Sequence, residues 1–132
     1  MAKKNEKTSA NYQVEIRESS KELSAKERIA IKDTSDAIKL DTACDAGDVI
    51  FTPIAYAILG VHNEKSDNID YENYVIIDSE NNKYVTSSMS FFDSFKNIWD
   101  EMVGEDEPWE LKCYKLDSKN YTGKKFLTCS II

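Results

Sequence analysis

A short basic and aromatic segment near the carboxyl end carries the residues best suited to chemistry in this 132-residue chain. It combines lysines with a tyrosine, an asparagine and a glycine: Lys119, Asn120, Tyr121, Gly123, Lys124 and Lys125. A ring can stack on an unpaired base and ammonium groups can contact phosphates, so this combination is typical of surfaces that bind single-stranded nucleic acid. The alternative interpretation is a lysine-rich loop that keeps an ordinary β protein in solution.

The segments on either side of this loop alternate as strands do, and they add residues to the same surface. In residues 109–116 the apolar residues occupy every second position, so Lys112 and Tyr114 point to the opposite face. In residues 125–132, Phe126 points away from the apolar set in the same way. The nucleic-acid-binding residues that the sequence predicts are therefore Lys112, Tyr114, Lys119, Asn120, Tyr121, Lys124, Lys125 and Phe126.

Hydrophobic periodicity predicts the elements that must position this surface. A helix is expected over 91–102, where apolar residues follow a 3.6-residue period, with Ser90 as its N-cap. A helical turn is expected at 37–43, ended by Gly47, and strands at 28–31, 49–61, 71–77, 84–86, 109–116 and 125–132. When the strands are counted from 49–61, the helix over 91–102 lies between the third and fourth of five strands. This order predicts a mainly β fold: the five-stranded, partly open barrel of the oligonucleotide/oligosaccharide-binding (OB) type.

The first 25 residues are expected to form a flexible or partner-bound tail, and residues 26–132 the OB-fold domain. The tail is polar and has too few apolar residues for a core of its own. Tyr12, Val14 and Ile16 nevertheless alternate with polar residues at strand spacing, so they are expected to add to a sheet edge, including that of a neighbouring subunit. A homo-oligomer assembled through this tail is therefore expected.

Charge is segregated along the chain, whose formal net charge is -7. The net charge is +3 over residues 1–32, -4 over 33–63, -9 over 64–108 and +3 over 109–132. A negative net charge repels the phosphates of DNA, which argues against a protein held on duplex DNA by its overall charge. Twelve acidic residues in 64–108 favour an alternative function. In that alternative the chain is a protein-interaction module, whose acidic face imitates DNA or docks on a host factor without binding nucleic acid.

Few residues suit catalysis or metal binding. His62 is the only histidine, and the sequence has no metal-ligand spacing, nucleophile elbow, P-loop or C-x-x-C motif. We therefore expect no enzyme activity, no cofactor and no metal. The three cysteines form no close pair, and no apolar segment reaches the roughly 18 residues of a membrane span, so a cytoplasmic location without membrane contact is expected.

Three segments resemble the small single-stranded DNA-binding proteins of phages and conjugative plasmids of Gram-positive bacteria: VHNEKSDNIDYENYVIID, KYVTSSMSFFDSFKNIWDEM and YKLDSKNYTGKKFLTCSII. The resemblance covers about residues 28–132 and implies an OB barrel that coats and protects strands exposed during replication or transfer. The groove residues that it implies are Ser118, Lys119, Asn120, Tyr121, Gly123, Lys124 and Phe126. Stacking and phosphate contacts serve DNA and RNA alike, so the sequence leaves that preference open.

Overall fold

The chain folds into two β-sheets and three helices in residues 11–119 and 122–132, which are the residues that the computed structural model describes. Strands account for 42% and helices for 24%, so the predicted mainly β class is confirmed. The elements are β1 (Tyr12–Ser19), α2 (Ala25–Lys32), β2 (Ile38–Lys39), α3 (Leu40–Ala46), β3 (Val49–Phe51), β4 (Pro53–Asn63), β5 (Asp70–Asp78), β6 (Lys83–Thr86), α4 (Met89–Met102), β7 (Leu111–Asp117) and β8 (Lys125–Ile131). The five-stranded sheet has the order β1-β4-β5-β6-β2, and the three-stranded sheet has the order β3-β7-β8.

β3 and β4 follow one another almost without interruption and connect the two sheets. β3 pairs with β7, whereas β4 pairs with β1 and β5. The break falls at Thr52, directly before Pro53, because proline lacks the N–H that a continuous ladder would use. The long strand predicted over 49–61 is therefore present in two pieces, with a register shift after Pro53.

The strand connections have the order of a Greek key. The β3–β4 segment, β5 and β6 are neighbours in sequence and in space, and the chain then returns through α4 so that β7 lies beside β3. Numbered from β3–β4, the spatial order is 4-1-2-3, which defines a Greek key. No pairing joins β6 to β8 in the described part of the chain, so neither sheet closes into a barrel.

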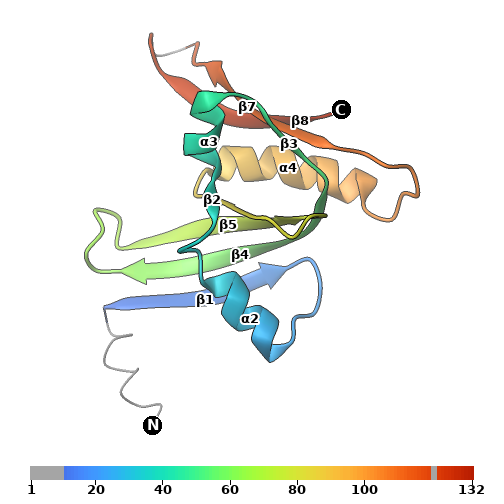
Figure 1. The fold of residues 1–132 in the computed structure, drawn as a ribbon. Coiled ribbons are helices and arrows are strands. Elements are labelled where there is room, and N and C mark those ends of the chain that lie inside the picture. Colours follow the sequence, from blue (N-terminus) through green and yellow to red (C-terminus); the bar gives the residue numbers. More distant parts are fainter. Residues whose placement is uncertain (1–10, 120–121) are drawn as a thin grey trace.

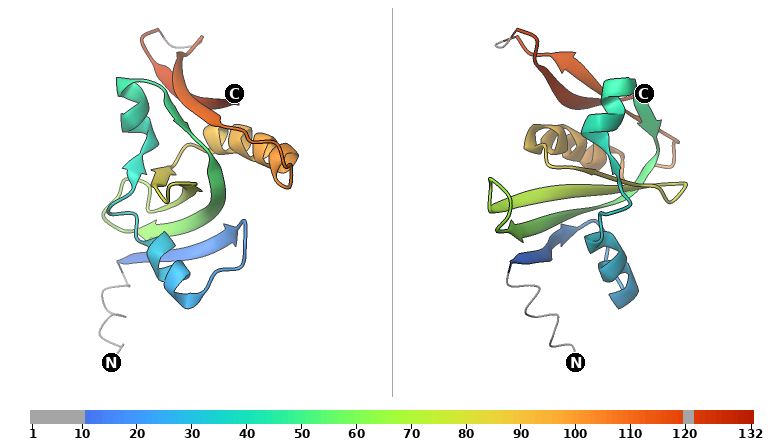
Figure 2. Two further views of the ribbon diagram at one scale, coloured as in Figure 1. Left: turned by 45° about the vertical axis from the view of Figure 1, so that its right-hand side comes forward. Right: turned by 60° about the vertical axis from the view of Figure 1, so that its left-hand side comes forward.

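The helix α4 lies between the two sheets, as Figures 1 and 2 show. Its apolar stripe includes Phe91, Phe92 and Phe95, all of which are buried. Tyr74 of β5 stacks on Phe92 with ring centroids 4.5 Å apart. The predicted helix is confirmed, although it begins two residues earlier. Its N-cap is Ser88 and not Ser90 as predicted, because the Ser88 hydroxyl accepts a hydrogen bond from the Phe91 N–H.

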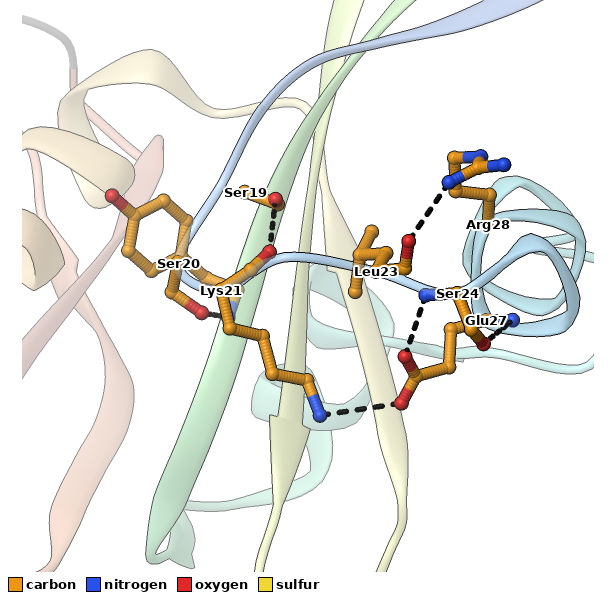
Figure 3. Close-up of polar contacts among 8 residues, drawn as sticks. Ser19, Ser20, Lys21, Leu23, Ser24, Glu27 and Arg28 are labelled. Carbon is orange, nitrogen blue, oxygen red and sulfur yellow. Dashed lines mark hydrogen bonds and ion pairs between the residues drawn. The ribbon is translucent and has the colours of Figure 1, made fainter.

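The helix α2 covers the opposite face of the five-stranded sheet, and it occupies residues 28–31, where a strand was predicted. That prediction is wrong because a capping box begins a helix here. The Ser24 hydroxyl accepts from the Glu27 N–H, and the Glu27 carboxylate accepts from the Ser24 N–H (Figure 3). Ile31 is buried in an aliphatic cluster with Ala57, Leu59, Val75 and Val85.

Residues 12–19, which belong to the predicted tail, form an edge strand of the five-stranded sheet. β1 pairs antiparallel with β4, from Tyr12 opposite Asn63 to Ser19 opposite Ala57. The predicted strand alternation is confirmed, and the sheet edge that it extends belongs to the same chain.

The helical turn predicted at 37–43 is a two-residue strand, β2, followed by the helix α3. β2 runs parallel to β6 and pairs Ile38 with Tyr84. α3 ends at Gly47, as predicted. Among the described residues, no helix combines the length and the apolar character needed to cross a membrane.

Candidate nucleic-acid interface

Lys112, Tyr114 and Phe126 lie on one face of the three-stranded sheet, which we call the outer face. Residues directly opposite in antiparallel strands project to the same side. The register therefore groups Ile50, Lys112, Tyr114, Leu116, Phe126, Thr128 and Ser130 on the outer face. The alternate residues, Leu111, Cys113, Leu127 and Cys129, are buried in the core beside α4. The predicted alternation of both strands is thus confirmed.

Tyr114 is held in place on this face by its neighbours. Its hydroxyl is hydrogen-bonded to the Ser130 hydroxyl at 2.7 Å. The Lys112 ammonium lies 5.0 Å from the ring centroid, within cation–π range. An aromatic ring and a positive charge therefore lie side by side, and both side chains are half-buried. A nucleotide could stack its base on such a ring and place its phosphate beside the ammonium group.

Beside this point the outer face is apolar and exposed. Phe126 is 44% exposed, its cross-strand partner Leu116 45%, and Ile50 of β3 49%. An exposed ring can accept a stacked base, and an exposed aliphatic group can support its edge or pack against another protein. The outer face is thus more apolar than the lysine content of the β7–β8 segment suggests.

The loop between β7 and β8 carries the remaining predicted residues. The Ser118 N–H donates to the Lys124 carbonyl at 2.8 Å, and Gly123 has a φ of 80°, a left-handed conformation that suits glycine. Lys119 and Lys124 are exposed on this loop. Asn120 and Tyr121, the residues on which the sequence argument chiefly depended, lie outside the described residues.

Lys125 projects to the face opposite Phe126, because successive residues of a strand alternate. Its ammonium is 3.3 Å from a carboxylate oxygen of Asp117, which lies directly across the strand pair. Lys115 lies on the same side as Lys125, and the hydrogen bond to Asp45 raises the pKa of its ammonium. Lys125 is therefore not part of the outer face, although the sequence grouped it with Phe126.

The sequence did not predict a hollow of about 380 Å³ on the α2 side of the five-stranded sheet, which we call the tyrosine hollow. Its lining includes Tyr12, Lys39, Thr42, Asn63, Tyr71 and Asn73. Partial burial raises the pKa of Tyr12, and the neighbouring Tyr71 phenol adds to the rise. These residues come from five elements, so only Asn73, a polar residue within the strand predicted over 71–77, gave any signal in the sequence.

The acidic segment 100–107 lies away from the lysine loop. Figure 1 shows the chain leaving α4 at one end of the molecule, whereas the β7–β8 loop is at the other. The acidic side chains here, including Asp100, Glu105 and Asp106, are exposed. An anionic ligand would be repelled from this end, so the charge pattern favours binding near the lysines.

Neither a metal centre nor a reactive thiol is found among residues 11–119 and 122–132. No group of three or more His, Cys, Asp or Glu side chains there could hold a metal ion. Cys44, Cys113 and Cys129 are free and buried. Burial raises the pKa of Cys113 far above its ordinary value and that of Cys129 to about 12, which disfavours the nucleophilic thiolate.

Comparisons of the chain with models of known protein families, with curated proteins and with solved structures give no match. Function is therefore inferred from the chain's own residues and their geometry.

Proposed function

We propose that this protein binds single-stranded DNA without sequence preference and coats strands exposed during phage or plasmid replication or transfer. The observation that carries the proposal is the outer face, where Tyr114 and Phe126 project from neighbouring strands and Lys112 lies over the Tyr114 ring. The adjoining loop adds Lys119 and Lys124. Rings for bases and ammonium groups for phosphates are the two components of such a surface.

The strand connections favour the OB fold as the finer description. With β3–β4 counted as the first strand, β5, β6, β7 and β8 are the second to fifth strands. Four strand pairings of the OB fold are then present: first with second, second with third, first with fourth, and fourth with fifth. OB domains bind oligonucleotides on the face of strands two and three and on the loops between strands one and two and between four and five. The tyrosine hollow borders β5, the second strand, and the lysine loop is the one between strands four and five.

Binding by one subunit is expected to be weak. Stacking contributes roughly 1–3 kcal/mol per base. Two rings and a few phosphate contacts therefore give a modest total once the ordering of a flexible strand is subtracted. A protein of this kind protects DNA by placing many copies side by side, and the predicted homo-oligomer is consistent with that mode of action.

The exposed apolar residues favour a second candidate function, a protein-interaction module. Leu116 and Phe126 form an exposed apolar cross-strand pair, and Ile50, which is opposite Lys112, is a further exposed apolar residue of the same face. Exposed apolar residues gathered on one face also mark protein-binding surfaces. This candidate predicts a co-purifying protein and no affinity for oligonucleotides.

Titration with fluorescent oligo-dT and with a duplex of equal length, each at two salt concentrations, tests the proposal. We expect preference for the single strand and weaker binding at high salt, because phosphate contacts release counterions. Equal affinity for both ligands, or none for either, would reject it. Tyr121→Ala adds a check on the loop and is expected to weaken binding by roughly 1–3 kcal/mol.

A further inference from the structure

His62 lies at the end of β4, where both of its ring nitrogens face carboxylates. Nδ1 is 2.7 Å from an Asp70 oxygen, and Nε2 is 3.1 Å from a Glu64 oxygen. Asp70 begins β5 and Glu64 follows β4, so the three side chains join both arms of the β4–β5 hairpin. The imidazole is about one-third exposed, so solvent protons reach it.

The protonation state decides how many of these contacts can form. An imidazolium donates from both nitrogens, whereas a neutral imidazole has one N–H and one lone pair. A lone pair directed at a carboxylate is repelled. The longer contact, to Glu64, is therefore the one that a neutral ring gives up.

We propose that His62 is a proton-dependent clamp of the β4–β5 hairpin: the imidazolium holds Asp70 and Glu64 together, and the neutral ring releases Glu64.

Asp70 and Glu64 are the two carboxylates that contact the His62 ring, and the other charged groups nearby have different partners or lie farther along the strands. On β1 the neighbours are Gln13, opposite His62 in the register, and then Glu15 and Arg17. Arg17 already pairs with Glu15 at 3.3 Å and with Glu72 of β5 at 2.9 Å. The hairpin also carries an exposed lysine, Lys65.

The clamp is connected to the first strand through Glu64. The Glu64 N–H donates to the Asn11 carbonyl at 3.0 Å, directly before β1 begins. Tyr12 and Asn63, the first cross-strand pair, both line the tyrosine hollow. Release of Glu64 is therefore expected to loosen the start of β1 and one side of this hollow.

The direction of the pH dependence follows from the contacts. Hydrogen bonds to Asp70 and then to Glu64 raise the pKa of His62 above its ordinary value of 6.5. A raised folded-state pKa gives stability that is fully present below pH 6.5 and is lost as the pH rises through the folded value. The hairpin is thus closed in mildly acidic solution and opens as the pH rises.

The full-length, ¹⁵N-labelled protein allows a direct test, because His62 is its only histidine and the ring signals need no assignment. We expect His62 to titrate above pH 6.5, with Asp70→Asn and Glu64→Gln each moving the midpoint to lower pH. Glu101→Gln, on α4, is the matched control and should leave it unchanged. A wild-type midpoint at or below 6.5, or one insensitive to Glu64→Gln, would overturn the clamp.

Amide hydrogen exchange reports the opening itself. After correction for intrinsic exchange, protection of the Glu64 amide in the wild type should fall several-fold between pH 6 and pH 9, and in His62→Gln it should not change with pH. Equal wild-type protection at both pH values would also overturn the proposal. No nucleic acid is used, so a failure of DNA binding would leave this result unaffected.

Discussion

The two sheets differ in how many of their faces are covered. The five-stranded sheet is covered on both, by α4 and its aromatic cluster on one side and by α2 and an aliphatic cluster on the other. Within residues 11–119 and 122–132, the three-stranded sheet is covered on one face only, and its outer face exposes Ile50, Leu116 and Phe126. Ala57 and Val75 of the larger sheet are, by contrast, completely buried.

This difference separates residues that stabilise the fold from residues that are free to bind. A side chain buried between layers contributes through the apolar area removed from water, roughly 25 cal/mol per Å². A half-exposed ring contributes less, so its presence on an acidic protein calls for another explanation. Stacking on a ligand is the explanation that we propose, and the following experiments test the contrast.

The largest effect is expected from Phe95→Ala. Phe95 is fully buried, and its ring centroid lies 5.7–5.9 Å from those of Phe92, Trp99 and Tyr56. Truncation leaves a cavity and should lower the free energy of unfolding by about 3–5 kcal/mol in urea denaturation. Phe126→Ala is the matched control on the outer face and should lower it by less than about 1 kcal/mol. Equal losses would remove the distinction between the two regions.

Asp78→Ala is expected to have the next largest effect. This buried carboxylate accepts hydrogen bonds from the Tyr84 hydroxyl, the Asn82 side chain and the backbone of Glu80 and Asn82. Losing them should lower the free energy of unfolding by roughly 1.5–3 kcal/mol. Asp67→Ala, at an exposed aspartate of the β4–β5 hairpin, should change it by less than about 0.5 kcal/mol.

The same carboxylate gives a pH dependence. Burial raises the pKa of Asp78, but the hydrogen bonds from Tyr84, Asn82 and Glu80 together lower it by more. The pKa of Asp78 therefore lies below its ordinary value of 3.8. A lowered folded-state pKa gives stability that is present above 3.8 and is lost as the pH falls through the folded value. The difference between wild type and Asp78→Ala should therefore shrink in strongly acidic solution, and a constant difference would contradict this role.

Tyr114→Ala and Phe126→Ala test the outer face as a ligand surface. Each is expected to weaken oligo-dT binding by roughly 1–3 kcal/mol, because one stacked base is lost. Ile54→Ala removes a comparably exposed apolar group from β4 and should leave the affinity unchanged. If all three variants bind like the wild type, the exposed rings serve a different partner.

The smallest effect separates the two faces of the β7–β8 hairpin. Lys112→Gln should reduce the slope of log affinity against log salt by about 0.7, the value for one phosphate contact on a single strand. Lys125→Gln removes a lysine already paired with Asp117 on the opposite side and should change the slope less. The reverse order would indicate that DNA follows the inner side of the hairpin.

The helices and strands predicted correctly were those whose hydrophobic periodicity is strong over the whole element. The stripe containing Phe91, Phe92 and Phe95 leaves no alternative to a helix, and the alternation around Lys112 and Tyr114 correctly assigned the faces of β7. Residues 28–31 misled because isoleucines suit strands, while the capping box of Ser24 and Glu27 lies outside that window. A short pattern must be interpreted together with its capping residues.

The candidate site was predictable only where it follows a single hairpin. Strand period alone brings Tyr114 and Phe126 to one face, and it could also have assigned Lys125 to the other. The hollow around Tyr12 and Tyr71 joins distant segments, so no local rule could have indicated it. The pairing of β1 with β4 could not be predicted either, because the alternation of apolar and polar residues in β1 would have suited any sheet edge.

The sequence by itself determined the elements whose residues repeat at a fixed period, and the face of each strand that turns to water, because period and polarity are local properties. The tertiary structure decided which edges pair, that the two sheets stay open with α4 between them, and that the larger sheet is covered on both faces. Those outcomes depend on contacts between residues far apart in the chain, whose free energies no short window contains.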